Sequence, residues 1–162
     1  MSLKKMLGTA GMLCLIPLAV FAQAPPSPHL ATDAFVFKSG KELEALTAKP
    51  GAPSPVTSIL SDHENYYVQT VARTQSGEPE FHTHWIDYGV VQEGQGNLVF
   101  GGSDTGSRDT GSGELRGGAM SGSVTRDLNP GDYFEIPAGQ WHQMTLKPGT
   151  KVLRVLVMKV RQ

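Results

Sequence analysis

Short β-type segments separated by turn residues dominate the chain from residue 66 onward. Each segment is rich in β-branched or aromatic residues and is bounded by Gly, Pro or Asp, as strands joined by turns are. Several short strands at such spacing are typical of a β-sandwich or a β-barrel. The expected strands are Tyr66–Thr74, Tyr88–Gln92, Asn97–Phe100, Tyr133–Ile136, His142–Leu146 and Val152–Val160.

One short helix is expected before these strands. Ser39 and Glu42 have the spacing of a capping box, in which the two residues satisfy each other's free backbone donors. An apolar stripe follows from Leu43 to Leu46. Three prolines between Pro50 and Pro55 then end the helix, because proline removes backbone donors and restricts the residue before it.

The segment from Gly101 to Gly122 has a different composition. It is rich in Gly, Ser, Asp and Thr and has few apolar residues. This composition predicts a long, mobile hairpin connection, interrupted near Glu114–Arg116, that could act as a lid.

The N-terminus has the pattern of a secretory leader. Lys4 and Lys5 precede an apolar run from Met6 to Phe21, and small residues follow at Ala22 and Ala24. The alternative is a retained membrane anchor, but the run is marginal in length for a bilayer. We expect a signal peptide at 1–24, a linker with the short helix at 25–57, and one β domain at 58–162, in a periplasmic or secreted protein.

Charge and cysteine content limit the partners of the mature chain. The single cysteine, Cys14, lies in the leader, so the mature protein has no disulfide and no thiolate metal ligand. Without Lys4 and Lys5 the chain keeps twelve basic and fifteen acidic residues, a net charge of −3 with neutral histidines. This balance favours neither nucleic acid nor, after cleavage, a membrane surface as a partner.

Two histidines stand two residues apart in His82-Thr83-His84. On a regular strand, residues at i and i+2 point to the same face, and within a barrel that face is the interior. Neutral imidazoles bind divalent transition metals, and a carboxylate oxygen widens the choice toward Mn and Fe. Asp87 is the nearest candidate carboxylate, but its odd offset from His84 requires a bulge or a turn between them.

A second segment ends at another histidine. Gly131 opens a turn, Pro137 ends a strand, Gly139 reverses the chain, and His142 starts the next strand. This segment resembles the second motif of the cupin superfamily, which runs Gly, five residues, Pro-x-Gly, two residues, His, three residues, Asn. Every spacing agrees, and only the last position differs, where Leu146 replaces Asn.

The first cupin motif runs Gly, five residues, His-x-His, three or four residues, Glu, six residues, Gly, and the resemblance to it is looser. The chain has Gly77 one residue closer than usual, then the His-x-His of His82 and His84. Asp87 takes the place of Glu after a gap of two residues, and six residues separate it from Gly94.

The resemblance spans roughly residues 66–160 and implies an all-β protein, a single cupin jelly-roll β-barrel that commonly forms homodimers, with the short helix outside the barrel. It implies one divalent transition metal, either Fe, Mn, Zn, Cu or Ni, and no organic cofactor. The metal ligands expected from it are His82, His84, Asp87 and His142. The residues expected to line the pocket are Glu80, Val90, Met144 and one of Tyr66 or Tyr67.

Three functions remain open, because one fold can support many reactions and therefore does not identify which one this protein carries out. The favoured one is a metal-dependent enzyme acting on a small organic molecule, with dioxygenase-like oxidoreductase chemistry. The second is an isomerase, lyase or decarboxylase in which the ion acts as a Lewis acid. The third is a non-catalytic cupin that binds a small molecule or a sugar. The sequence assigns no catalytic residue.

Overall fold

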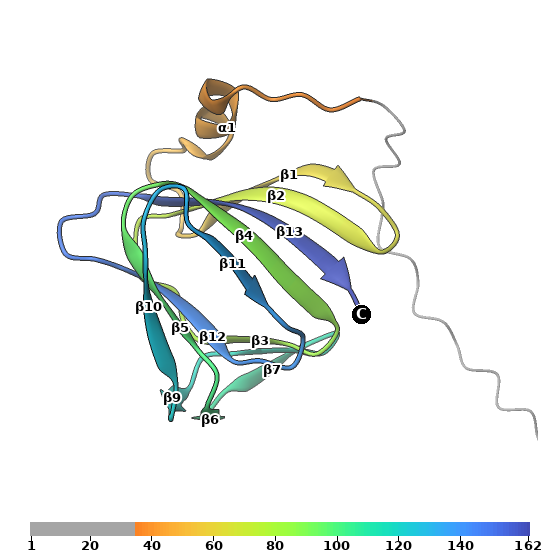
Figure 1. Ribbon diagram of the computed structural model, residues 1–162, viewed down its shortest axis with the longest axis vertical. Coiled ribbons are helices and arrows are strands. Elements are labelled where there is room, and N and C mark those ends of the chain that lie inside the picture. The colour runs from red at the N-terminus through yellow and green to blue at the C-terminus, as the bar shows by residue number, and fades with distance from the viewer. Residues whose placement is uncertain (1–34) are drawn as a thin grey trace, which may run out of the picture.

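The computed structural model describes residues 35–162 (Figure 1). The expected signal peptide, with Cys14, lies outside the described residues. Within the described part, no helix is long and apolar enough to cross a membrane.

The single helix in this part of the chain, α1 (Gly40–Thr47), begins where the capping box predicted. The Ser39 backbone N–H donates to Glu42 Oε2 at 2.8 Å, and the Glu42 N–H donates to Ser39 Oγ at 3.4 Å. At the other end of the helix, the buried Thr47 hydroxyl accepts a 3.0 Å hydrogen bond from Arg154 Nε. This bond attaches the helix to the outside of the barrel.

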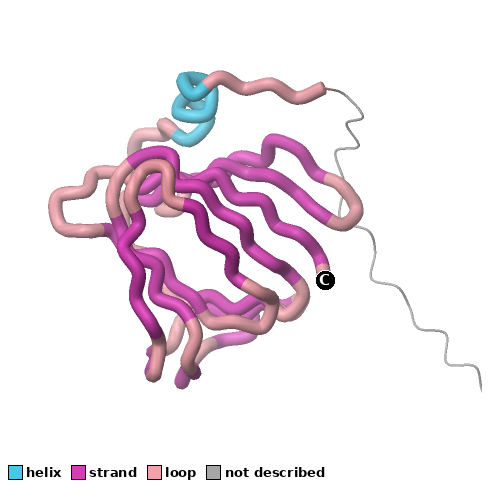
Figure 2. The backbone as a smooth tube through the Cα atoms, in the orientation of Figure 1, coloured by secondary structure: helices cyan, strands magenta, loops and turns pink. Residues whose placement is uncertain are grey.

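Antiparallel strands form two main sheets that face each other across the interior (Figures 1 and 2). One sheet has the order β1-β2-β13-β4-β11 and the other the order β10-β5-β12-β3-β8-β7, while β6 and β9 pair separately. This arrangement confirms the predicted β-barrel. The strands are β1 (Val56–Asp62), β2 (Tyr66–Arg73), β3 (Glu80–His82), β4 (Trp85–Glu93), β5 (Gly96–Phe100), β6 (Ser103–Thr105), β7 (Arg108–Gly111), β8 (Glu114–Arg116), β9 (Ala119–Ser121), β10 (Val124–Leu128), β11 (Tyr133–Ile136), β12 (His142–Leu146) and β13 (Leu153–Arg161).

The core depends on the two-residue period of the strands. On β13 the inward row is Leu153, Val155 and Val157, each at most 4% exposed. These side chains pack with apolar residues of the other strands, including Val91 of β4. The next inward residue of the same row is Lys159, which is also buried. The row therefore passes from the apolar core into a polar cluster inside the barrel.

The segment 101–122 connects the antiparallel strands β5 and β10, as expected of a hairpin connection, but it contains four short strands, β6 to β9, that the sequence analysis did not predict. Strand β8 pairs with β3, which lies far away in the sequence, and sets Glu114 opposite His82. The glycines of this segment form tight turns. Gly118, for example, has a positive φ of 81°, and a Cβ there would lie 2.2 Å from Asp104 Oδ1. Composition alone could not reveal this pairing with a distant strand.

Candidate metal centre

Strand β3 ends at His82, and the position of this end determines which histidines lie close together. Thr83 and His84 form a bend, in which both the Thr83 N–H and its hydroxyl donate to the Gly113 carbonyl at 2.8 Å. His84 is exposed, whereas His82 is 2% exposed. The structure therefore does not bring His84 into the barrel with His82. The two-residue alternation, from which His82 and His84 were expected on one face, applies only within a continuous strand.

The same bend turns Asp87 inward. Asp87 lies on β4 and is 4% exposed, and its Oδ2 is 3.5 Å from His82 Nε2. It is also 3.7 Å from Nε2 of His142, the buried first residue of β12. The turn that the sequence required between His84 and Asp87 is thus present. Three of the four predicted ligands, His82, Asp87 and His142, converge inside the barrel.

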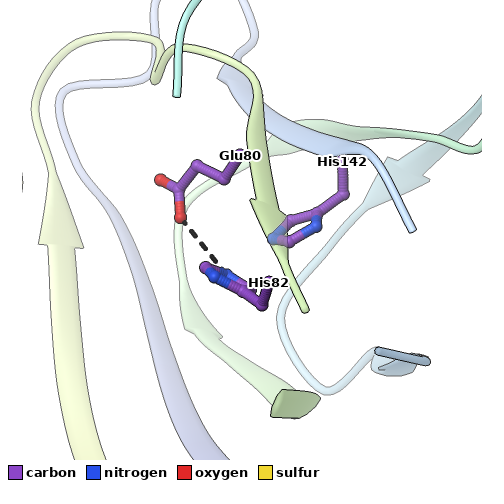
Figure 3. A group of neighbouring side chains, drawn as sticks. All are labelled: Glu80, His82 and His142. Atoms are coloured by element: carbon purple, nitrogen blue, oxygen red, sulfur yellow. Dashed lines mark ion pairs between the residues drawn. The ribbon is translucent and has the colours of Figure 1, made fainter. Parts of the chain in front are cut away.

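A second carboxylate, Glu80, joins the two histidines (Figure 3). Glu80, His82 and His142 each offer one ligand atom, and these atoms all lie within 4.8 Å of one another. Glu80 Oε2 is 3.7 Å from His82 Nε2, while its Oε1 pairs with Arg73 at 3.0 Å and with Arg116 at 3.1 Å. The sequence analysis expected Glu80 to line the pocket. Its i−2 offset from His82 was the signal for this inward position.

Hydrogen bonds orient both imidazole rings. His82 Nδ1 lies 2.5 Å from Glu114 Oε2, and His142 Nδ1 lies 3.2 Å from the Gln140 carbonyl oxygen. Since both partners are acceptors, each neutral ring carries its proton on Nδ1 and leaves the Nε2 lone pair toward the centre. Metal-binding histidines commonly have such partners. The sequence analysis did not identify Glu114 as a partner of His82, because it treated residues 114–116 only as an interruption of a long connection.

A lysine also reaches this centre. Lys159 Nζ is 2.7 Å from His82 Nε2 and 3.0 Å from Asp87 Oδ1, and the residue is 8% exposed. Lys159 stands opposite Asp87 in the β13–β4 pairing, so both side chains leave neighbouring strands on the same inner face. The sequence analysis did not identify this cation. The sequence feature that could have revealed this cation is a lysine that continues the alternating row of inward apolar residues on β13.

The surroundings set the protonation of these groups. Burial raises the pKa of Asp87, but the bond with His82 and the charge of Lys159 lower it by more, to about 2. Burial lowers the pKa of His142. Burial also lowers the pKa of His82, but the bonds with Asp87 and Glu114 raise it by more. An ionised Asp87 and a neutral His142 at neutral pH are the protonation states that metal ligation requires, whereas the raised pKa of His82 favours the protonated ring, which must lose a proton before it can bind an ion.

Two hollows that share lining residues lie beside the cluster. A small cavity of about 40 Å³ is lined by Glu80, Asp87, His142, Met144 and Lys159, among others. A wider pocket of about 360 Å³ also contains Glu80 and Lys159 in its lining. It adds polar and aromatic side chains at the barrel mouth, which are Tyr67, Trp85, Glu114 and Arg116. A small molecule can therefore approach the cluster from the mouth.

Three of the expected pocket residues, Glu80, Met144 and Tyr67, line these hollows, but Val90 does not. Val90 is 41% exposed and lies outside the barrel. With Asp87 turned inward, the two-residue period places the buried Gly89 and Val91 inside and Val90 outside. The prediction for Val90 was wrong because the bend at residues 83–84 shifts the phase of β4.

The side chains present fit a divalent metal. Two imidazole nitrogens with fixed tautomers and two carboxylates, Asp87 and Glu80, are donors that suit Mn, Fe, Zn, Ni or Cu(II). His82 and His142 would hold the ion together with one or both carboxylates. The opposing feature is Lys159, whose ammonium group lies against His82 Nε2.

Comparison with known proteins identifies the fold. No protein-family model matches the chain, and neither does any curated protein. Among solved structures, a candidate mannose-6-phosphate isomerase from Ralstonia eutropha JMP134 has a TM-score of 0.53 at 19% identity, covering 77% of this chain and 99% of that one. An oxalate oxidase in complex with glycolate has a TM-score of 0.53 at 18% identity, covering 82% and 62%. The cupin domain of Cnp3 from Schizosaccharomyces pombe has a TM-score of 0.52 at 10% identity, covering 68% and 67%.

These likenesses show that the chain has the cupin fold. The two sequence motifs predicted this fold, and the antiparallel barrel with one short helix confirms it. At such low identity the likeness extends to the fold and not to the reaction.

Replacing Glu114 tests the orientation of His82. Glu114→Gln removes the charged acceptor of the Nδ1 proton, so we expect the affinity for Zn²⁺ to fall by about 10- to 100-fold. Competition with a chromophoric chelator measures it. Glu78→Gln is the matched control, because Glu78 is an exposed partner of Arg108 away from the histidines. Equal affinities in the two variants would show that Glu114 does not support a metal ligand.

Proposed function

We propose that this protein is a metal-dependent cupin enzyme that acts on a small organic molecule, with dioxygenase-like oxidoreductase chemistry as the favoured reaction. The observation that carries the proposal is the convergence of His82 and His142 with Glu80 and Asp87 in a buried centre beside a pocket. Two histidines and one carboxylate on an ion with open positions form the ligand set of non-haem iron oxygenases. An oxalate oxidase is among the similar structures.

The mouth pocket favours a small organic acid as the substrate. Arg73 and Arg116 line it, and although both pair with Glu80, their remaining N–H groups can bind a second carboxylate. Arg73 Nε is buried without a hydrogen-bond partner. Met144 and Val157 are among the apolar side chains that line the smaller cavity. A bound divalent ion would supply a Lewis acid and, if redox-active, a site for dioxygen.

Lewis-acid catalysis by an isomerase, lyase or decarboxylase is the second candidate. The observation in its favour is the set of proton-carrying groups at the cavity, where Glu80 and Lys159 could move a proton on the substrate. The likeness to a candidate mannose-6-phosphate isomerase agrees with this class. If no turnover is found, the third candidate function is a non-catalytic cupin that binds a sugar or another small molecule.

We further propose that the protein is exported to the periplasm or secreted, and that it forms homodimers. Export is supported by the leader-like pattern of residues 1–24. Dimer formation is supported by apolar side chains on the outer face of the five-stranded sheet. Val90 and Tyr133 are neighbours there, and both are exposed, as is Met158. Clustered exposed apolar residues are typical of protein interfaces.

Metal analysis of the exported protein tests the centre. We expect one divalent ion per chain by mass spectrometry, and loss of the ion in the double variant His82→Ala with His142→Ala, because both imidazoles supply ligands. His84→Ala is the matched control and should keep the ion, since His84 is exposed beyond the end of β3. Metal content no higher than that of the double variant would refute the proposed centre.

Turnover with and without dioxygen tests the reaction class. The protein loaded with Fe²⁺ or Mn²⁺ is mixed with a panel of small organic acids, and oxygen uptake and products are measured. We expect oxygen-dependent loss of an acid, abolished in the His82→Ala and His142→Ala double variant. The same turnover under anaerobic conditions would support the Lewis-acid class. Binding without turnover in either condition would contradict the enzyme proposal.

Purification from the periplasmic fraction tests export and assembly. The intact mass should lack the leader, and light scattering should give the mass of two chains. Val90→Glu is expected to give single chains, because it places a charge on the outer face of the five-stranded sheet. Val124→Glu, at an exposed position on β10 of the other sheet, is the control and should leave the dimer intact. A single-chain mass for the unaltered protein would refute the dimer.

A further inference from the structure

Lys159 lies against two of the ligands of the candidate metal centre, His82 and Asp87. Its Nζ lies 2.7 Å from His82 Nε2 and 3.0 Å from Asp87 Oδ1. Asp87 is also close to the second histidine, since its Oδ2 is 3.7 Å from His142 Nε2. The ammonium group therefore lies where a bound cation would interact with His82 and Asp87.

Because of the orientation of His82, its contact with Lys159 and its binding of a metal ion exclude each other. Its Nδ1 is bonded to Glu114, so Nε2 is the nitrogen that carries the lone pair when the ring is neutral. One imidazole lone pair either accepts a hydrogen bond from an ammonium group or binds a metal ion. An ion can therefore bind His82 only after Lys159 has moved away from Nε2.

Charge adds to this competition. Asp87, Glu80 and Glu114 bring three carboxylates close to His82, and Arg73, Arg116 and Lys159 supply three cations. Each of the two arginines pairs with Glu80, which leaves Lys159 as the cation paired with Asp87 among the described residues. A divalent ion in the same buried space is repelled by the ammonium group, and this repulsion is weakly screened where water is excluded.

We propose that Lys159 is an internal cation of the centre, which holds the ligands together in the metal-free protein and lowers their affinity for a divalent ion. The inference rests on the proposed metal centre. Neutralising Lys159 then has two opposite effects. The metal-free protein loses stability, because Asp87 is left buried without its cationic partner. The metal-bound form gains affinity, because His82 Nε2 is free and the repulsion is gone.

The experiment compares Lys159→Met, Lys159→Gln and Lys159→Arg with the unaltered protein. Lys151→Met is the matched control, because Lys151 is exposed in the turn before β13. Each exported protein is stripped with a chelator, its melting temperature is recorded, and Zn²⁺ and Mn²⁺ affinities are measured by competition titration. Lys159→Gln serves in place of Lys159→Met if the latter does not fold.

We expect the neutral variants to melt at a lower temperature than the unaltered protein without metal, and to bind Zn²⁺ tighter by on the order of tenfold or more. Lys159→Arg and Lys151→Met should not gain affinity. Unchanged metal affinity in a folded neutral variant, with metal binding intact, would overturn the inference and leave the proposed centre standing. No metal binding in the unaltered protein or the neutral variants would refute both.

Discussion

The pairing of buried charges is the constraint on which the inside of this barrel depends. Ionised side chains removed from water are stable only when other groups compensate them. Here β3 supplies Glu80 and His82, β4 supplies Asp87, and β13 supplies Lys159, so the compensating groups come from different strands. A change in the register of any of these strands would leave a buried charge without its partner. The cluster and the strand register therefore support each other.

The pairing of β3 with β8 links this cluster to the glycine-rich segment. It sets Glu114 opposite His82 and Arg116 opposite Glu80, and both pairs are bonded through their side chains. A segment whose composition is that of a linker thus supplies two of the groups that orient the centre. The turns at its glycines allow the short strands to reverse direction within a few residues. This is how one segment provides both a wall of the pocket and support for a histidine.

Much of the fold and part of the site could be predicted from the sequence. The capping box at Ser39 and the spacing from Gly131 to His142 are local patterns, and the helix and strands formed there as predicted. His142 reached the interior for the same reason, and Asp87 did so through the turn that its odd offset from His84 required. His84 and Val90 show the limit of such reasoning, because a bend at residues 83–84 shifts the phase of all later positions on β4. A two-residue period cannot reveal where a strand stops.

The sequence by itself determined the cupin barrel, the capped helix, and a candidate centre made of nitrogen and oxygen ligands without cysteine. These follow from side-chain periodicity, turn residues and motif spacing, which act over a few residues. Only the tertiary structure decided that Lys159 faces the histidines, that Glu114 orients His82, and that His84 lies outside. Those outcomes depend on pairing between strands far apart in the chain, where geometry and the need to compensate buried charge select the partners.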